Sequence, residues 1–352
     1  MSKTYFIFIF FLLLFIFLVP EIANAGVINP DISVIGQLIS NRTDDAKSAD
    51  ANKNTLNLGE TEIQFESYLN PYSRGTFVLT IDTGGLTVEE AYINIFKGLP
   101  DGLAVKAGKY RVGFGKLNPQ HPHDYSSITA PRVIAAMLPG DDGYNETGAQ
   151  ASYMFPTPGS WASILSADVL NGSSWHPDEP QTATGWVARW ANSFLLNDTP
   201  LDIGFSATEG TNNVTWNRKT DVYGFDVKTK IPFNSITRLT LQGEYFYNDS
   251  DVVTSTTTGS FNRTGRQGFY ALFDLKFAQQ WNAGVIYDQY NPADNSNLTD
   301  SAIKGFLGFS FLEESTLLRL AYEQFMPQGS PVVNTVTLQL LFSMGPHKAH
   351  QF

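Results

Sequence analysis

Apolar and polar residues alternate along most of the chain. In the stretch TEIQFESYL, residues 61–69, Ile63 and Phe65 fall on one face of an extended segment, and Glu62 and Glu66 fall on the other. The same two-residue period recurs in RQGFYALFDLKF and, near the end of the chain, in TVTLQLLFS. A period of two is the signature of β-strands with two different faces. The pattern therefore predicts an all-β protein.

About sixteen such segments can be counted, and most have the length of roughly 9 to 12 residues that a tilted membrane strand requires. They are expected to begin near Asp31, Thr61, Arg74, Val88, Gly102, Thr147, Ser160, Thr184, Pro200, Lys219, Ser235, Thr264, Gln280, Ser301, Ser315 and Val332. Connections after even-numbered segments are short, whereas most of those after odd-numbered segments are long and polar, as in residues 41–60, 113–145 and 248–262.

This alternation of loop lengths is typical of outer-membrane barrels, which have short periplasmic turns and longer outer loops. A soluble β-sandwich is the alternative fold, but it gives no reason for long and short loops to alternate. We predict a single antiparallel transmembrane β-barrel of about sixteen strands. The strands and their loops account for the residues after the first 25, so no plug domain is expected.

The first 25 residues have the organisation of a secretory signal peptide. Lys3 precedes the unbroken apolar run YFIFIFFLLLFIFLV, and the small residues Ala23 and Ala25 offer a cleavage site before Gly26. An uncleaved membrane helix is the alternative, although the run is shorter than most spans. We expect a signal peptide at residues 1–25 and a barrel at residues 26–352, in the outer membrane of a Gram-negative bacterium.

Composition removes several classes of function. The formal net charge of -11 argues against a nucleic-acid partner, and the absence of cysteine excludes disulfides and thiolate metal sites. The sequence contains neither GxSxG nor HExxH, and none of the five histidines falls in the middle of an expected strand. We therefore expect no enzymatic activity.

If the apolar faces meet lipid, the opposite faces line the interior. Charged residues of both signs occupy these faces, and the expected pore lining is Glu62, Glu66, Arg189, Lys228, Arg238, Glu244, Arg266, Asp274, Lys276, Lys304, Arg319 and Glu323. Rings of one sign set ion selectivity in pores, whereas mixed charges also brace a barrel wall through cross-strand pairs. The lining thus leaves the sign of selectivity open.

The segment 113–145 follows the fifth strand and has no strand or helix period. Its apolar centre, VIAAML at residues 133–138, would be unfavourable on a fully exposed loop. We therefore expect an outer loop that folds against the inner wall and constricts the channel. The loop residues expected to face solvent and contact solute are Lys116, His121, His123, Asp124, Arg132, Asp141 and Asp142.

Two of the five histidines lie in this loop, on either side of Pro122. Zinc prefers imidazole nitrogens and carboxylates, so His121, His123 and Asp124 are candidate metal ligands, and His176 in the next outer loop is a fourth. The alternative is a solvated loop in which proline and aspartate make turns. His347 and His350 form a second candidate pair near the end of the chain. Zinc is the one cofactor that these residues suggest.

The stretch GKYRVGFGKLNPQHPHDY, the later GDDGYNETG and the closing GPHKAHQF resemble a group of bacterial outer-membrane proteins. These are catalogued as zinc-regulated TonB-dependent outer-membrane receptors and are related to the phosphate-selective porin superfamily. The resemblance implies a sixteen-stranded outer-membrane barrel produced in response to metal status. Phe352 fits the terminal aromatic residue through which such barrels meet their assembly machinery.

The leading interpretation is a porin-like channel for passive passage of small hydrophilic solutes or ions. The alternative is a metal or metal-complex uptake protein in which HPHD captures the ion. Expected partners are outer-membrane lipid, the barrel-assembly machinery through the C-terminal strand, and small solutes. Both a monomer and a homotrimer are compatible with the sequence.

Overall fold

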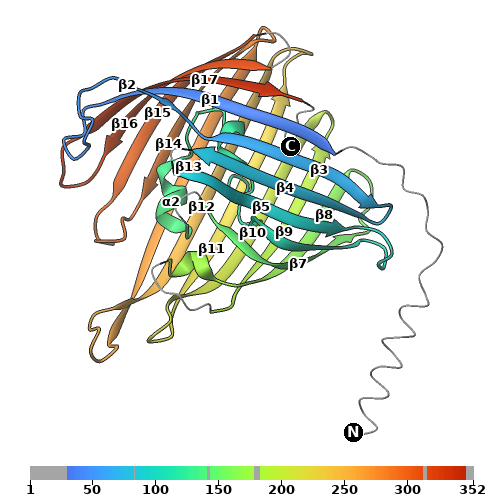
Figure 1. The fold of residues 1–352 in the computed structure, drawn as a ribbon, viewed down its shortest axis with the longest axis horizontal. Coiled ribbons are helices and arrows are strands. Elements are labelled where there is room, and N and C mark those ends of the chain that lie inside the picture. Colours follow the sequence, from blue (N-terminus) through green and yellow to red (C-terminus); the bar gives the residue numbers. More distant parts are fainter. Residues whose placement is uncertain (1–29, 83, 141–142, 178–182, 312–314, 346–352) are drawn as a thin grey trace, which may run out of the picture.

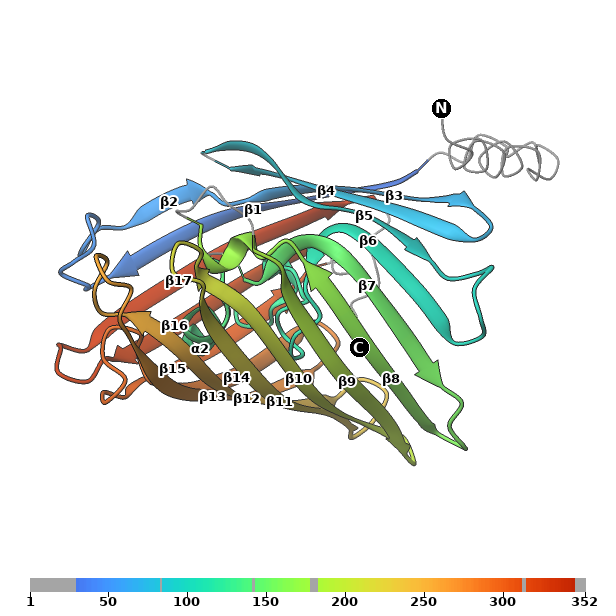
Figure 2. The ribbon, with the colours of Figure 1, turned by 90° about the horizontal axis from the view of Figure 1, so that it is seen from below.

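The computed structural model describes residues 30–82, 84–140, 143–177, 183–311 and 315–345. These residues form one sheet that closes into a barrel, drawn in Figures 1 and 2. Its strands are β1 (Asp31–Thr43), β2 (Thr55–Leu58), β3 (Thr61–Asn70), β4 (Ser73–Asp82), β5 (Gly85–Ile95), β6 (Leu103–Arg111), β7 (Asn145–Phe155), β8 (Trp161–Leu170), β9 (Gly185–Leu196), β10 (Thr199–Asn213), β11 (Arg218–Pro232), β12 (Arg238–Val253), β13 (Phe261–Phe277), β14 (Trp281–Tyr290), β15 (Asp300–Ser310), β16 (Thr316–Met326) and β17 (Val333–Met344).

The short strand β2 and strand β3 are two parts of one barrel strand, because both pair with β1. Leu38 pairs with Leu58 and Ile35 pairs with Glu62, so three steps along β1 face four steps along the partner. The extra residue is a β-bulge, which bends a strand without ending it. With β2 and β3 counted together, the barrel has sixteen strands, as predicted.

The barrel closes where the first strand meets the last. β1 pairs antiparallel with β17 over ten residue pairs, from Val34 with Met344 to Thr43 with Thr335. Closure satisfies the backbone hydrogen-bonding groups that an open edge would leave facing lipid. The prediction of a single antiparallel barrel is therefore confirmed.

One predicted loop was partly wrong. Residues 248–262 were expected to form a long connection, but β12 continues to Val253 and β13 begins at Phe261. The polar residues of this stretch stay in the ladder because they pair with one another. Arg263 on β13 forms ion pairs with Asp249 and Asp251 on the neighbouring β12 and with Asp221 on β11. The polar residues begin where the strands leave the lipid-facing apolar belt, and the strands continue beyond this point.

The two faces of the barrel differ sharply in polarity. On β15, Ile303 is 41% exposed on the outer surface, whereas the adjacent Lys304 points inward and is 4% exposed. Exposed apolar side chains recur on the outside of nearly every strand, which is the surface a membrane barrel presents to lipid. Among the described residues, no helix is long and apolar enough to span a membrane.

The largest cluster of buried apolar residues lies inside the barrel, around the connection from β6 to β7. This connection contains the 3-10 helix η1 (Pro122–Asp124) and the helix α2 (Arg132–Met137). The helix α2 packs against β12, β13 and β14, and both views place it within the ring of strands (Figures 1 and 2). We call residues 112–144 the interior loop.

Candidate functional site: the interior loop and the cavities beside it

Asn118 joins the two ends of the interior loop. Its side-chain amide donates hydrogen bonds to the carbonyls of Val112 (2.8 Å) and Tyr144 (3.0 Å), and its oxygen accepts one from the Tyr144 N–H (2.8 Å). Asn118 is only 2% exposed, so these bonds are made without competition from water. This role was not predicted from the sequence, because both partners are backbone groups whose positions depend on how the loop folds.

Apolar side chains of the loop fit against glycines of the barrel wall. Phe114 stacks on Phe246 with ring centroids 6.2 Å apart, and its ring occupies the space that a side chain at Gly224 would fill. Val133 of α2 occupies the corresponding space at Gly268. Glycines in strands commonly mark a close approach of this kind. The wall is thus shaped to receive the loop.

Gly115 provides a second kind of close approach. Its φ of +63° is unfavourable for other residues, and a Cβ there would lie 1.9 Å from Glu244 Oε2. Glu244 instead accepts a hydrogen bond of 2.8 Å from the backbone N–H of Leu117. Burial of the carboxylate therefore depends on a glycine at this point of the loop.

Basic residues of the wall donate to backbone carbonyls of the loop. Arg319 donates to the carbonyls of Tyr125 and His123, and Arg266 donates to that of Ala136. Lys304 donates to the Thr129 carbonyl at 3.3 Å and pairs with Glu323 at 2.9 Å. The prediction treated these cations as pore lining. They do point inward, but their side-chain N–H groups are bonded to the loop and hold it in place.

The loop separates two cavities inside the barrel. One, of about 570 Å³, is lined by Lys230, Arg238, Gln280 and Trp281 and lies toward the short turns. The other, of about 790 Å³, is lined by Thr43, Asp45, Lys53 and Thr335 and lies toward the long connections. Tyr125 and Pro131 of the loop line both. By the usual orientation of such barrels, the first cavity is the periplasmic one and the second is the outer one.

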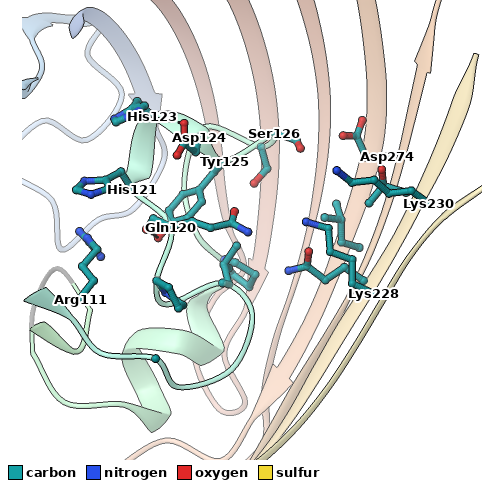
Figure 3. Close-up of a pocket in the computed structure, with 18 of the residues that line it drawn as sticks. Arg111, Gln120, His121, His123, Asp124, Tyr125, Ser126, Lys228, Lys230 and Asp274 are labelled. Carbon is teal, nitrogen blue, oxygen red and sulfur yellow. Dashed lines mark hydrogen bonds and ion pairs between the residues drawn. The ribbon is translucent and has the colours of Figure 1, made fainter. Parts of the chain in front are cut away.

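Four cations gather on one side of the periplasmic cavity, and we call them the basic wall: Lys228, Lys230, Arg238 and Lys276. Arg238 and Lys276 are direct cross-strand partners on β12 and β13, an arrangement in which like charges repel. Figure 3 shows Lys228 and Lys230 on the barrel strands, across the cavity from His121 and His123 on the loop. Asp274 lies on the same wall.

The remaining predicted lining residues are engaged in ion pairs. Arg189 forms a two-pronged contact with Asp226 (2.6 and 3.0 Å), and Glu66 pairs with Arg74 (2.8 Å). Glu66 and Arg74 brace the neighbouring strands β3 and β4, whereas Arg189 on β9 reaches across β10 to Asp226 on β11.

A histidine–glutamate cluster faces the basic wall and consists of Glu62, Glu89, Glu90, His121 and His123. Glu62 Oε2 lies 3.1 Å from His121 Nδ1 and 3.2 Å from His123 Nδ1. His121 Nδ1 is also 3.5 Å from Glu89 Oε1, and its Nε2 is 3.2 Å from Glu90 Oε2. The two imidazole rings stack with centroids 5.5 Å apart. Loop and wall together thus build one compact group of ligand-type atoms.

Glu89 was missed from the sequence, and a bulge explains why. Strict alternation on β5 sends Glu90 inward and Glu89 outward, but Val78 pairs with Glu90 while Leu79 pairs with Val88. Glu89 is the extra residue of this β-bulge, and it pairs with the buried Arg111 at 2.7 Å. Two adjacent carboxylates therefore reach the same cluster.

The electrostatics of the cluster favour positive charge on or beside His121. Burial by itself lowers the pKa of His121, but its contacts with the carboxylates of Glu62, Glu89 and Glu90 outweigh burial and raise that pKa well above its usual value. A group of three carboxylates needs a compensating cation when water is excluded.

The loop residues expected to face solvent are mostly engaged with the wall. Lys116 pairs with Asp202 at 2.5 Å, and Arg132 donates to Glu323 at 2.7 Å. Lys116 is thereby partly withdrawn from solvent, whereas the Arg132 side chain stays 36% exposed while it is paired. His121, His123 and Asp124 do line the periplasmic cavity, and Arg132 lines the outer one. Asp141 and Asp142 lie outside the described residues.

Of the four predicted metal ligands, His121 and His123 come together. Asp124 lies at the far nitrogen of His123, with 3.3 Å between Oδ1 and Nε2. His176 is buried near η2 (Ser173–Trp175) and belongs to neither group of metal-ligand side chains found among the described residues, so its inclusion was wrong. The signal peptide, His347, His350 and Phe352 lie outside those residues.

Comparison with known proteins supports the fold. No family model matches the chain. A protein of Aquifex aeolicus (strain VF5), described as uncharacterized, is 28% identical over 337 residues, covering 85% of this chain and 71% of that protein. OmpT of Vibrio cholerae has a TM-score of 0.60 at 10% identity, with 92% of this chain and 100% of that chain covered.

Two further outer-membrane proteins show the same architecture. OprB of Pseudomonas putida has a TM-score of 0.60 at 10% identity, covering 90% of this chain and 94% of that chain. An anion-selective porin from Comamonas acidovorans has a TM-score of 0.58 at 11% identity, covering 89% and 98%. The porin part of the sequence resemblance is confirmed at the level of fold, and the part concerning TonB-dependent zinc receptors stays a prediction. The closed barrel and its apolar exterior place the chain in the outer membrane of a Gram-negative bacterium, with the fold of the porins.

Proposed function

We propose that the protein is a passive channel for small hydrophilic solutes or ions, constricted by the interior loop. One observation carries the proposal: the loop lies within a closed sixteen-stranded barrel, with a cavity lined by charged side chains on each side of it. Barrels of this strand number are wide enough to enclose an aqueous channel. Tyr125 and Pro131 line both cavities, so we expect the route to be narrowest beside them.

Charged side chains of different kinds line opposite sides of this channel. The histidine–glutamate cluster and the basic wall face one another over the periplasmic cavity (Figure 3). In the cluster, carboxylates contact histidines and Arg111, whereas cations outnumber carboxylates on the basic wall. A passing anion is therefore attracted toward the basic wall, and we infer a preference for anionic solutes.

The test is single-channel recording on refolded protein in planar bilayers. Discrete conductance steps are the expected result, and folded protein that gives none would overturn the proposal. Since the chain has no cysteine, access can be mapped with introduced thiols. Gln120→Cys places a thiol on the cavity surface, and a charged, water-soluble thiol reagent should lower its conductance. Leu307→Cys, on the lipid-facing surface, is the control and should be insensitive.

The oligomeric state belongs to the proposal as well. OmpT of Vibrio cholerae has been solved in a trimer form, with a TM-score of 0.59 to this chain. That likeness supports a homotrimer in the membrane, each protomer with its own channel. Native mass spectrometry of the detergent-solubilised protein tests this, and a purely monomeric species contradicts it.

A further inference from the structure

The histidine–glutamate cluster has a geometry that conduction through the barrel does not require. We propose that Glu62, His121 and His123 bind a divalent transition-metal ion of the Zn²⁺ class, held where the interior loop meets the wall. Their ligand atoms form one of two such groups among the described residues, and every atom of the group lies within 4.8 Å of the others. The proposal goes beyond the channel function, because binding does not depend on conduction.

The distances between these atoms suit a shared metal. Zinc lies about 2.0 to 2.2 Å from imidazole nitrogens and carboxylate oxygens, so neighbouring ligands of a tetrahedral site are about 3.3 to 3.5 Å apart. Glu62 Oε2 is 3.1 Å from His121 Nδ1 and 3.2 Å from His123 Nδ1. Glu89 Oε1, 3.5 Å from His121 Nδ1, is held by Arg111 at 2.7 Å and lies outside this group of three.

The far side of each imidazole is also arranged as in a metal site. His121 Nε2 contacts Glu90 Oε2 at 3.2 Å, and His123 Nε2 lies 3.3 Å from Asp124 Oδ1. An ionised carboxylate only accepts hydrogen bonds, so His121 Nε2 is the donor to Glu90. Metal-ligating histidines usually make such a bond through the nitrogen that does not bind the ion. Both rings therefore present Nδ1 to the same oxygen of Glu62.

The hydrogen bonds of the cluster leave a place for a cation. A metal ion takes the place of the proton on His121 Nδ1, because metal ligands must be deprotonated, and the Nδ1 lone pair then faces the ion beside Glu62 Oε2. The buried Nδ1 approaches that oxygen without the alignment of a hydrogen bond, and Glu89 Oε2 is likewise buried without a hydrogen bond. A metal ion between the three ligands satisfies His121 Nδ1.

Ligand chemistry and access narrow the choice of ion. Two imidazoles and a carboxylate suit Zn²⁺, Co²⁺, Ni²⁺ and Cu²⁺, whereas Ca²⁺ and Mg²⁺ prefer sites made of oxygen alone. Glu62, His121 and His123 line the periplasmic cavity, so an ion in the channel can reach them. The site joins β3 to the interior loop, and a bound ion therefore adds a cross-link at the constriction.

The experiment is zinc titration of the full-length, chelator-treated protein in detergent micelles, by calorimetry and elemental analysis. We expect saturable binding of one Zn²⁺ per chain that Ca²⁺ does not compete away. His121→Ala combined with His123→Ala should lower the association constant by more than about a hundredfold, since two ligands are lost. Glu90→Gln removes the carboxylate at His121 Nε2, keeps an oxygen for the Arg111 N–H, and should lower the association constant by about 10- to 100-fold.

His176→Ala is the matched control, because it removes a buried histidine outside the cluster and should leave zinc affinity unchanged. Circular dichroism and heat-dependent gel mobility establish that each variant keeps the barrel. X-ray absorption at the zinc edge should show two imidazole ligands. The proposal is overturned if the folded wild type does not bind zinc, or if the double variant binds as tightly as wild type. Zinc binding without conductance overturns the channel and leaves the metal site standing.

Discussion

Two segments of the interior loop are held by different kinds of contact. The helix α2, in the second half, buries Val133, Ile134 and Met137 against the wall. The first half also buries Phe114, but further along it His121 and His123 contact carboxylates instead of apolar side chains. Apolar burial fixes position through many weak contacts, whereas a few charged contacts in a polar cavity can also bind a ligand. Apolar burial thus anchors both halves of the loop, and only the first, which we call the ligand half, also carries ligand chemistry.

Truncation of a buried side chain of α2 should have the largest effect. Met137 is 1% exposed, and Met137→Ala should lower the free energy of unfolding by about 2 to 5 kcal/mol. Loosening of α2 should also raise single-channel conductance. Unfolding by urea in lipid vesicles and bilayer recording measure the two effects. Met154→Ala is the matched control, since Met154 is 53% exposed on the outer surface. Equal losses for both variants would contradict a special role of α2.

The second effect concerns the clamp that joins the loop ends. Asn118→Ala leaves the Tyr144 N–H and two carbonyls without their partners, which should cost about 1 to 3 kcal/mol of unfolding free energy. Asn118→Asp keeps the acceptor for Tyr144 but loses both donations, so its loss of stability should be of similar size. The same vesicle assay measures both variants. Wild-type stability of both variants would show that Asn118 does not stabilise the junction of the loop ends.

A third prediction concerns the basic wall that faces the ligand half of the loop. Unit charges 4 Å apart interact by about 1 kcal/mol in water, so each lost lysine should shift the anion-to-cation permeability ratio by up to about fivefold. Lys228→Gln with Lys230→Gln should therefore move the reversal potential in a salt gradient toward cation selectivity. Lys97→Gln, in an exposed turn and outside both cavity linings, should leave it unchanged. No shift in the double variant would show that the basic wall does not set selectivity.

The smallest effect is expected from salt alone. The Debye length falls from about 30 Å at 0.01 M to about 3 Å at 1 M ionic strength, so attraction to the basic wall is screened as salt rises. The wild-type permeability ratio should approach unity over this range. Selectivity that persists at 1 M salt would indicate that anions contact the basic wall directly, because long-range attraction is screened at this salt concentration.

Alternation of apolar and polar residues determined the barrel, its strand number and the inward faces. Each residue takes one of two faces, and lipid on one side and water on the other make the difference visible along the chain. The apolar centre of the loop likewise indicated a segment that must be covered. These features are local or repeat regularly, so one sequence is enough to predict them.

Tertiary structure decided what the loop meets. The bulge that turns Glu89 inward and the fit of Phe114 at Gly224 depend on strands distant in sequence. His121 and His123 were candidate ligands from the sequence, yet their shared partner Glu62 became apparent only when β3 and the loop came together. Periodicity assigns a residue to a face, but closure of the barrel sets which strands lie opposite each other and how far apart their side chains end.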